Sequence, residues 1–204
     1  GGTITDLCGF VVSSYMRGIS HIVIPTTLLG MVDAAIGGKT ALNVQQIRNL
    51  IGSYKNPDAM IIYTTFINSL NKNDMINGYA EIIKYALIMD ETLFIKIEEN
   101  IEQLLSNTNL NLIESIIETC MNHKLNIVNQ DPYDEGIRNI LNFGHTVGHA
   151  LEGFLNFKIP HGVAVLYGMH VASYLSYEKK NITAKEYNRI TSLIKKIGLK
   201  KIEK

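Results

Sequence analysis

Two histidines one helical turn apart are the residues whose types and spacing point most directly to chemistry. His145 and His149 share one face of any helix that contains both, because side chains four residues apart lie one above the other. His161 follows after a short break, so this region holds three of the chain's six histidines. Imidazole nitrogen is a common ligand of zinc. The spacing therefore predicts a metal site, and the alternative is a set of core or surface histidines without a ligand.

A carboxylate on another element is expected to complete such a site, and Glu81 is the best choice in the sequence. Most of its neighbours within residues 80–87 are apolar, which predicts that the helix face around Glu81 is buried by other helices. Lys84 lies three residues further on and shares this face. A surface ion pair of about 0.3 kcal/mol is the alternative. A buried pair needs a compensating partner, which a metal and an anionic substrate would provide.

Basic residues occur at further positions where an anion could bind. Arg138 and Asn142 are four residues apart and precede the histidines, so on a continuous helix they extend the same polar stripe. Together with Lys39, Lys84 and Lys124 they predict a site for a substrate with two anionic groups. A solvated helix face is the alternative.

Two glycine-rich segments have the backbone N–H groups that bind phosphate. Gly1-Gly2 leads into an expected helix, whose N-terminus attracts anions. Gly37-Gly38-Lys39-Thr40 has the end of a P-loop motif, but Asp33 stands where that motif requires glycine, so a P-loop is excluded. A loop that ends the preceding helix is the alternative for this segment.

Composition excludes some partners and compartments. The chain of 204 residues has 19 basic and 19 acidic residues, which argues against nucleic acid as its partner. Its apolar runs are shorter than the roughly 20 residues that span a bilayer, so we expect no membrane partner. The two cysteines lie far apart, which favours a reducing cytoplasm over a disulfide framework. Because it opens on Gly1-Gly2 without a methionine, we expect it to be part of a longer protein.

The first third of the sequence has an α/β pattern. Thr5-Asp6 is expected to cap a helix that stops at Gly18, and Thr26-Thr27 to open a second helix. A short buried strand is expected at 21–25 and a second strand at 59–63. Alternating helices and strands are typical of a nucleotide-binding part.

After about residue 70 the spacing of apolar residues is helical throughout. Its 3.6-residue periodicity predicts helices over residues 72–89, 91–105, 109–130, 137–155, 162–178 and 184–197. The predicted fold is therefore an α/β nucleotide-binding part followed by an all-α metal-binding domain. We place the boundary so that the two parts cover residues 1–68 and 69–204.

Many short stretches match a known family in their order along the chain. The first are Gly1-Gly2-Thr3-Ile4-Thr5-Asp6-Leu7, Tyr15-Met16-Arg17-Gly18, Ile24-Pro25-Thr26-Thr27-Leu28-Leu29, Val32-Asp33, Ile36-Gly37-Gly38-Lys39-Thr40 and Asn49-Leu50-Ile51-Gly52. The later ones are Gly78 to Lys84, Gly136-Ile137-Arg138-Asn139, Leu141-Asn142-Phe143-Gly144-His145, Gly148-His149-Ala150 and His161-Gly162. On these motifs the sequence resembles the sugar-phosphate cyclases and, among them, the 3-dehydroquinate synthase family.

The resemblance implies a fold, a reaction and cofactors. In this family a nucleotide-binding α/β domain precedes a helical metal domain, usually in a homodimer. The implied reaction converts the sugar phosphate 3-deoxy-arabino-heptulosonate 7-phosphate to 3-dehydroquinate and phosphate, a carbon–oxygen lyase step of the shikimate pathway to aromatic amino acids. The implied cofactors are NAD and a divalent metal, Zn²⁺ or Co²⁺.

The resemblance also implies a role for individual residues. Glu81, His145 and His161 correspond to the metal ligands, and His149 to an active-site histidine beside the phosphate and the proton-transfer path. Contacts to the substrate are implied for Lys39, Asn49, Lys84, Lys124, Arg138 and Asn142, and for Arg17 reaching in from a neighbouring subunit. Contacts to NAD are implied for Gly2, Asp6, Thr26, Thr27, Asp33, Lys39 and Arg48.

Three other functions fit parts of the same pattern. A sister sugar-phosphate cyclase would act on another substrate, and a metal-dependent polyol dehydrogenase has a related two-domain plan. A truncated paralogue without activity would act as a dimerising or binding partner. The segment from Gly37 to Thr40 favours dehydroquinate synthase among the cyclases, and the set of basic residues argues against a polyol dehydrogenase.

Overall fold

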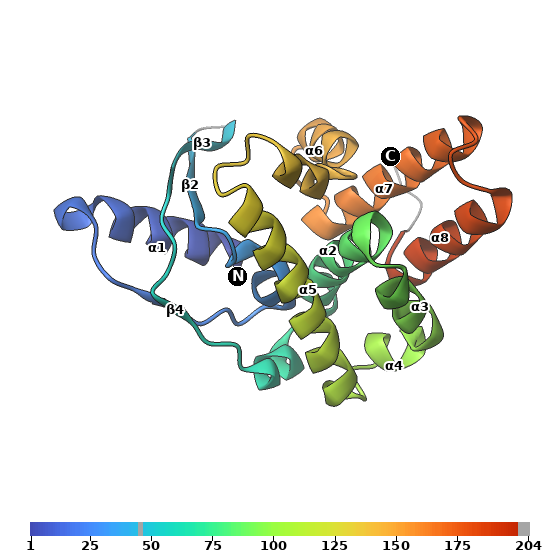
Figure 1. Cartoon of the computed structure of the whole chain (residues 1–204), viewed down its shortest axis with the longest axis horizontal. Coiled ribbons are helices and arrows are strands. Elements are labelled where there is room, and N and C mark those ends of the chain that lie inside the picture. Colours follow the sequence, from blue (N-terminus) through green and yellow to red (C-terminus); the bar gives the residue numbers. More distant parts are fainter. Residues whose placement is uncertain (45–46, 200–204) are drawn as a thin grey trace.

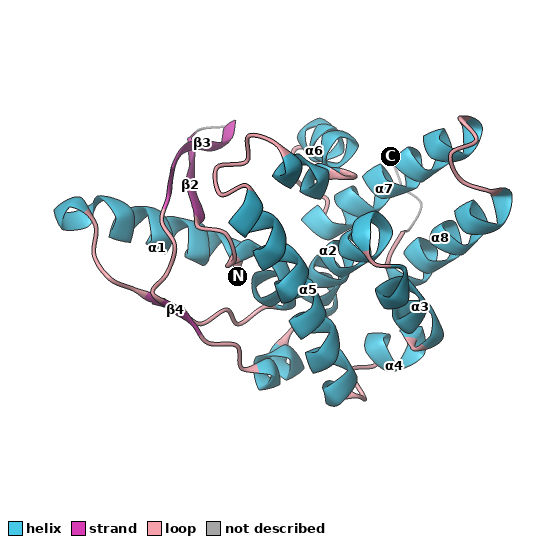
Figure 2. Cartoon of the chain, in the orientation of Figure 1, coloured by secondary structure: helices cyan, strands magenta, loops and turns pink. Residues whose placement is uncertain are grey.

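A computed structural model describes residues 1–44 and 47–199, without the side chains of Ile47 and Arg48. An α/β part that holds all the described strands is followed by a part made of helices (Figure 1, Figure 2). The first part contains α1 (Gly2–Ser14), η1 (Tyr15–Arg17), β1 (Ile22–Val23), η2 (Gly30–Ala34), β2 (Lys39–Val44), β3 (Ile47–Tyr54), β4 (Ala59–Met60) and η3 (Thr64–Ser69). The predicted fold class, an α/β part followed by an α domain, is confirmed.

In the helical part, four of the six predicted spans match the described helices closely and two are interrupted. It contains α2 (Lys72–Met89), α3 (Glu91–Glu99), α4 (Ile101–Leu105), α5 (Leu110–Gln130), η4 (Ile137–Asn142), α6 (His145–Phe154), α7 (His161–Glu178) and α8 (Ala184–Ile197). The predicted helix 91–105 breaks at Asn100, and the predicted helix 137–155 breaks at Gly144, where φ is 79°. Apolar spacing continues across both breaks, so periodicity alone predicts single helices. Among the described helices, none has the length and apolarity that crossing a bilayer requires.

Side-chain caps explain where four of these helices begin. The side chains of Asn71, Asp90 and Asn109 each accept a backbone N–H group from the first turn of α2, α3 and α5. Thr183 and Glu186 form a reciprocal capping box at the start of α8. Each cap satisfies a backbone donor that a helix leaves unpaired, which contributes about 1 kcal/mol.

The first helix begins earlier than its expected cap. α1 starts at Gly2, and the hydroxyl of Thr5 donates to the carbonyl oxygen of Gly1 at 3.2 Å. Thr5 therefore lies inside the first turns of the helix, so its prediction as the cap is wrong. The expected stop is present, because Gly18 follows η1 with φ of 111°.

The strands expected at 21–25 and 59–63 are present but short. β1 and β4 have two residues each and pair in parallel, with Ile22 opposite Ala59. Ile22 is 61% exposed, so the prediction of a buried strand is wrong. Among the described residues these two strands pair only with each other, which leaves their outer edges without a partner strand.

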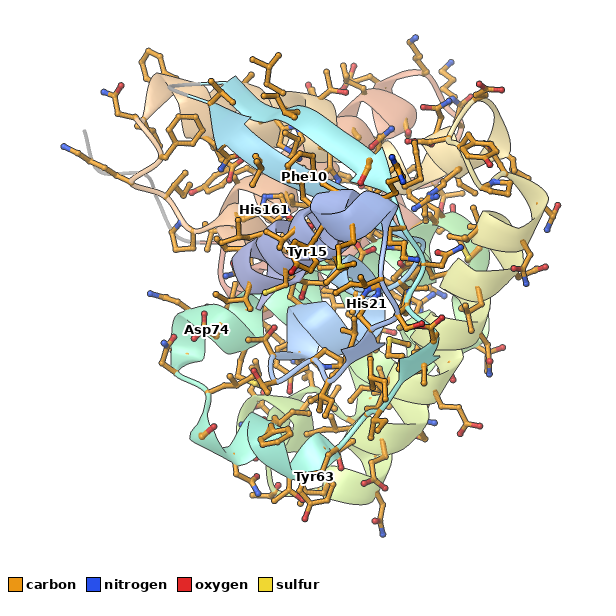
Figure 3. The ribbon with its side chains drawn as sticks, turned by 90° about the vertical axis from the view of Figure 1, so that its left-hand side faces the viewer. Phe10, Tyr15, His21, Tyr63, Asp74 and His161 are labelled. Carbon is orange, nitrogen blue, oxygen red and sulfur yellow. The ribbon has the colours of Figure 1, made fainter. Side chains whose placement is uncertain are left out.

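The structure contains a β-hairpin that periodicity does not predict. β2 and β3 pair antiparallel, with Lys39 opposite Tyr54. The loop expected over Gly37-Gly38-Lys39-Thr40 is therefore wrong for Lys39 and Thr40, which begin β2. Gly52 lies against the carbonyl group of Thr40, and a Cβ atom at Gly52 would clash with it. The hairpin contacts α1, and Figure 3 shows its strands beside this helix.

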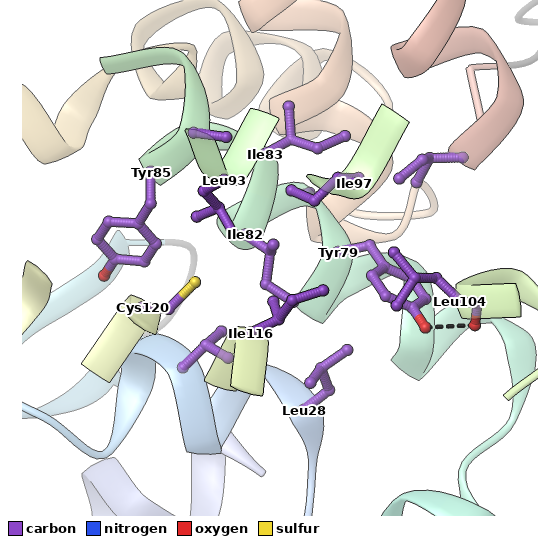
Figure 4. Packing of buried hydrophobic residues seen from close by; sticks show 14 of the residues in the cluster. Leu28, Tyr79, Ile82, Ile83, Tyr85, Leu93, Ile97, Leu104, Ile116 and Cys120 are labelled. Carbon is purple, nitrogen blue, oxygen red and sulfur yellow. Dashed lines mark hydrogen bonds between the residues drawn. The ribbon is translucent and has the colours of Figure 1, made fainter. Parts of the chain in front are cut away.

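The hydrophobic core lies around α2, mainly in the helical part, and extends to Leu28 and Met31 of the α/β part (Figure 4). α2 contacts α3, α5, α7 and α8. Ile82, Ile83 and Ile116 are almost completely buried there, and each contributes about 2 kcal/mol to folding. The buried hydroxyl of Tyr79 donates to the carbonyl oxygen of Leu104 at 2.5 Å. α2 is therefore held firmly on several sides, which makes it a suitable support for a functional group.

Candidate functional site

Three elements bring the predicted metal ligands together. Glu81 lies in the middle of α2, while His145 and His161 are the first residues of α6 and α7. The backbone N–H of Gly162 donates to the side-chain carbonyl of Asn77 on α2 at 2.7 Å. A Cβ atom on Gly162 would stand 2.5 Å from the Cα atom of Asn77. The start of α7 therefore lies directly against α2, one turn before Glu81.

Glycines allow α6 and α7 to approach closely. A Cβ atom on Gly144 would stand 2.6 Å from the side chain of Met169, and one on Gly168 would clash with the carbonyl oxygen of Gly144. A Cβ atom on Gly148 would lie 3.2 Å from the carbonyl group of Ala164. The imidazole rings at the starts of the two helices consequently lie 5.4 Å apart, centroid to centroid.

The three side chains form a compact donor set. The Nε2 atoms of His145 and His161 lie 3.4 Å and 3.6 Å from Oε1 of Glu81, and the ligand atoms all lie within 4.8 Å of one another. The Nδ1 atoms face the backbone carbonyl oxygen of Phe143 and Oε1 of Glu152, both at 3.3 Å. Both imidazoles thus present Nε2 towards the same carboxylate oxygen. Two imidazole nitrogens and one carboxylate oxygen are chemically suited to zinc or cobalt.

Burial and charge shift the pKa values of these groups. Burial raises the pKa of Glu81, but the charge of Lys84 and hydrogen bonds from His145 and His161 outweigh it and hold the pKa well below its ordinary value. Burial lowers the pKa of His161, but hydrogen bonds with Glu152 and Glu81 outweigh it and raise the pKa to about 9. In this arrangement His161 is protonated at neutral pH, and the proton must leave before Nε2 can bind a cation.

Two buried lysines share one carboxylate beside the donor set. Lys84 pairs with Glu81 one turn earlier on α2, and its Nζ lies 3.0 Å from Oδ2 of Asp33. Lys124 on α5 pairs with Oδ1 of Asp33 and donates to the backbone carbonyl of the same residue at 2.6 Å. Asp33 belongs to η2, so these pairs connect the α/β part with both α2 and α5.

A cavity of about 620 Å³ opens beside these groups. The predicted site residues that line it are Gly2, Asp6, Asp33, Lys39, Asn49, Glu81, Lys124, Arg138, His145, His149 and His161. A second cavity of about 130 Å³ shares part of this lining and adds Lys84 and Asn142. A third of about 400 Å³ is lined by Gly2, Thr27 and His161, and Figure 3 shows His161 beside α1. The structure therefore brings most of the predicted site residues together.

Three predicted site residues are not placed at these cavities. Arg17 is exposed in η1, at the opposite end of α1 from Gly2. Thr26 is exposed before η2, and neither residue lines the three cavities. The side chain of Arg48 lies outside the described residues. The roles of these three residues stay predictions from the resemblance.

The predicted polar stripe from Arg138 to the histidines is interrupted. η4 ends at Asn142 and α6 begins only at His145, so these side chains do not share the face of one helix. The buried guanidinium of Arg138 instead donates to the carbonyl oxygens of Pro132 and Gly37 at 2.8 and 3.1 Å. It joins the loop before η4 to the glycine loop before β2 while also lining the cavity.

Sequence reasoning missed the loop that closes one side of the site. The carboxylate of Asp134 pairs with Lys39, and the hydroxyl of Tyr54 donates to the carbonyl oxygen of Tyr133 at 2.8 Å. The side chain of Asp131 accepts three backbone N–H groups and so shapes this loop. The acidic composition of the loop is a signal in the sequence, but its partner Lys39 lies 95 residues away from Asp134, beyond any local spacing rule.

Known families and relatives match this chain along almost its whole length. Residues 78–203 match the family model described as 3-dehydroquinate synthase C-terminal, and residues 1–77 match that described as 3-dehydroquinate synthase N-terminal. The 3-dehydroquinate synthase of Clostridium tetani is 45% identical over 199 residues, which cover 98% of this chain and 53% of the relative. That of Dictyoglomus thermophilum is 46% identical over 179 residues, or 87% of this chain and 50% of the relative. The chain thus spans about half the length of the curated relatives it matches.

Two solved structures with the same fold are cyclases with NAD⁺ and a metal bound. The 2-epi-5-epi-valiolone synthase of Streptomyces hygroscopicus, with NAD⁺ and Zn²⁺ bound, has a TM-score of 0.93 and 28% identity, covering 100% of this chain and 57% of that one. A 2-deoxy-scyllo-inosose synthase complexed with carbaglucose-6-phosphate, NAD⁺ and Co²⁺ has a TM-score of 0.89 and 26% identity, covering 98% and 54%. With both family models matched in order along its sequence, the chain belongs to the 3-dehydroquinate synthase family.

Proposed function

We propose that this chain carries the metal and substrate site of a 3-dehydroquinate synthase, which converts 3-deoxy-arabino-heptulosonate 7-phosphate to 3-dehydroquinate and phosphate. The observation that carries the proposal is the convergence of Glu81, His145 and His161 beside a cavity lined by cationic side chains. Relatives named 3-dehydroquinate synthase are 45% and 46% identical to the chain, whereas the sister cyclases are 28% and 26% identical. This difference favours the heptulosonate phosphate over the substrates of the sister cyclases.

The residues present fit the two cofactors of this reaction. Glu81, His145 and His161 would hold Zn²⁺ or Co²⁺, because their ligand atoms lie within 4.8 Å of one another. A Cβ atom on Gly1 would stand 3.2 Å from the side chain of Thr27. Glycine therefore keeps the space beside the backbone N–H groups at the start of α1 free of a side chain. The N-terminus of a helix favours the phosphates of NAD. When bound, the metal supplies Lewis acidity towards substrate oxygens, and NAD accepts and returns a hydride.

The cationic side chains bind and orient the sugar phosphate. Lys39, Lys124 and Arg138 line the main cavity from β2, α5 and η4, so positive charge converges on it from three elements. Asp6, Asp33 and Glu81 line the same cavity, so a substrate with a carboxylate at one end and a phosphate at the other shares these cations with the acids. Charge-assisted hydrogen bonds to both ends hold the carbons between them in a fixed orientation, which favours ring closure.

Ion pairs hold the two buried lysines in place, and the charge of Lys84 keeps the ligand carboxylate of Glu81 ionised. Lys84 balances the charge of Glu81, so the buried carboxylate stays available as a ligand. Asp33 holds Lys84 and Lys124 on separate carboxylate oxygens. Burial and the charge of Arg138 lower the pKa of Lys124 to about 7, so an anionic substrate beside it favours its ammonium form. Both amino groups are already positioned, so the cost of ordering them is not incurred on binding.

His149 is the residue that we assign to proton transfer. Its side chain lines the main cavity, and its ring lies 5.3 Å from that of His145 and 6.0 Å from that of His161, centroid to centroid. Imidazole is the commonest general acid and base in enzymes. From this position His149 can take up a proton from the substrate or return one beside the proposed metal site.

The remaining assignments extend the proposal to NAD and to a second subunit. We assign contacts with NAD to Gly2, Asp6, Thr26, Thr27, Asp33, Lys39 and Arg48. Burial raises the pKa of Asp6 to about 6, so its charge depends on what fills the cavity. The exposed Arg17 is assigned to the site of the other subunit in a cytoplasmic homodimer. We place the end of the NAD-binding part at residue 68, before α2.

Phosphate release tests the proposed reaction. The zinc-loaded protein is incubated with the heptulosonate phosphate, with and without NAD, and released phosphate is measured. We expect release only when NAD is present, and none from Glu81→Gln. Calorimetric titration with the heptulosonate phosphate alone tests the cationic cavity independently of turnover. Release that does not need NAD, or no release and no binding, would contradict the proposal.

A further inference from the structure

A buried acid that has no role in the proposed reaction lies directly behind the donor set. Glu152 is on α6 and is only 1% exposed. It follows His145 by seven residues and His149 by three, so it extends their face of the helix. Its Oε1 atom lies 3.3 Å from Nδ1 of His161, on the side of the ring that points away from Glu81. A buried carboxylate is costly unless it interacts with a charged or hydrogen-bonding partner, so this contact requires an explanation.

The two histidines of the donor set are held in different ways. Each presents Nε2 to Glu81 and has an acceptor at Nδ1. For His145 that acceptor is the neutral backbone carbonyl of Phe143, and for His161 it is the carboxylate of Glu152. An ionised acceptor makes a stronger hydrogen bond than a neutral one and increases the electron density on the ring. His161 is therefore the more strongly oriented of the two imidazoles.

We propose that Glu152 is a positioning residue for the metal ligand His161. It accepts a hydrogen bond from Nδ1–H, which fixes the tautomer whose Nε2 lone pair points towards Glu81. It also increases the electron density on Nε2, which makes this nitrogen a stronger ligand for a divalent cation. This inference rests on the metal site of the proposed function. The alternative is a second cation site, because ligand atoms of His149, Glu152 and His161 also lie within 4.8 Å of one another. The contact with Nδ1 of His161 would then be a metal bond.

Zinc affinity tests this role without measuring turnover. Zn²⁺ is titrated in competition with a chelator into the unaltered protein, Glu152→Gln and Glu98→Gln. Glu98 pairs with Arg189 between α3 and α8, so its variant controls for the loss of one partly buried carboxylate. We expect Glu152→Gln to bind zinc about 10- to 100-fold more weakly, and Glu98→Gln to bind it as the unaltered protein does. Thermal unfolding of each variant reports its folding separately.

A spectroscopic readout separates positioning from a merely structural role. In the zinc-loaded protein with ¹⁵N-labelled histidine, we expect the Nδ1–H proton of His161 far downfield, because its acceptor is a carboxylate. In Glu152→Gln this resonance should move upfield, while the resonances of His145 stay in place. An unchanged resonance of His161, together with unchanged zinc affinity, would overturn the inference.

The outcomes also separate this inference from the proposed function. If the unaltered protein does not bind zinc, the metal site itself is wrong and the inference is overturned with it. If the unaltered protein binds zinc and Glu152→Gln binds it equally well, only the role of Glu152 is overturned. Two zinc ions per chain, with one lost in Glu152→Gln, would show a second cation site and would also overturn the positioning role.

Discussion

His161 connects the donor set with the buried acids around it. Its Nε2 faces Glu81 and its Nδ1 faces Glu152, so one imidazole lies between two carboxylates. Since this ring is only 26% exposed, its interactions with both acids are weakly screened by water. The protonation of His161 consequently affects both metal binding and the stability of the fold.

We expect the stability of the metal-free protein to fall as the pH rises towards 9. Hydrogen bonds with Glu152 and Glu81 raise the pKa of His161 from 6.5 to about 9 on folding. The stabilisation by the charged imidazole is complete below pH 6.5 and is lost as the pH rises through 9. Its upper limit is about 3 kcal/mol. Denaturant unfolding in the presence of a chelator measures it, and an equal pH dependence in His161→Asn would contradict its assignment to His161.

We expect Lys124→Met to weaken binding of the sugar phosphate much more than folding. Methionine keeps the buried part of the side chain, and Asp33 retains Lys84 as a partner. Loss of one charge-assisted hydrogen bond corresponds to about a 10- to 100-fold weaker Kd. Calorimetry and thermal unfolding measure the two effects, with the exposed Lys72→Met as the control. A large fall in melting temperature with unchanged Kd would count against a role in binding.

For single residues, the sequence predicts the chemistry but not the pairing. The histidines and Glu81 can be selected because they are few and lie at helical spacing among apolar neighbours. The pairing of Asp33 with two lysines, and of Asp134 with Lys39, depends on how distant elements pack. Local spacing does not contain that information, so these contacts appear only in the folded chain.

For whole elements, the helices are predictable and the hairpin is not. α5 and α8 combine apolar periodicity with a polar cap at the start, so both signals agree, whereas α2 has the cap but is buried on nearly all sides. β2 and β3 lack strict alternation of apolar and polar residues, and the period-two signal of a strand is therefore weak. The break between η4 and α6 cannot be predicted from Gly144 alone. This glycine adopts a positive φ at the turn and also allows α6 to pack closely on α7, and the sequence does not distinguish these two roles.

We expect Gly168→Ala to disturb the packing of α6 on α7 and with it the donor set. The new Cβ atom would clash with the carbonyl oxygen of Gly144, and relief of the clash moves the start of α6, where His145 lies. The expected loss is about 2 kcal/mol of stability, with weaker zinc binding. Denaturant unfolding and zinc titration measure both.

Gly153→Ala is the matched control for this prediction. Gly153 is on α6, the helix against which Gly168 of α7 packs, and a Cβ atom there meets nothing within 4 Å. This change should stabilise the helix by about 0.5–1 kcal/mol, because alanine loses less backbone freedom than glycine on folding. Equal effects of the two substitutions would show that close approach of α6 and α7 is not required.

For the whole molecule, the site lies where the α/β part meets the helical part. Polar contacts cross this junction from Asp33 to Lys84 and Lys124, and from Arg138 to Gly37. Figure 1 shows α5 between the hairpin of β2 and β3 on one side and α2, α7 and α8 on the other. The family motifs imply site residues in both parts, and the main cavity is lined by residues from both.

We expect Asp33→Asn to loosen the junction between the two parts. The amide leaves Lys124 buried without its carboxylate partner, which costs about 3 kcal/mol. Hydrogen exchange should increase in β2, β3 and the start of α6. Asp58→Asn is the control, because Asp58 accepts the backbone N–H of His21 within the α/β part at 2.7 Å. Equal changes in exchange for both variants would argue against a special role of Asp33 at the junction.

The zinc content of the protein tests the central claim most directly. We expect elemental analysis of the zinc-loaded and dialysed protein to find one zinc ion per chain, held by Glu81, His145 and His161. Glu81→Gln keeps the shape of the side chain but removes its charge, and it should retain almost no zinc, whereas Glu98→Gln should retain as much as the unaltered protein. Full zinc content in Glu81→Gln, or no zinc in the unaltered protein, would contradict the account.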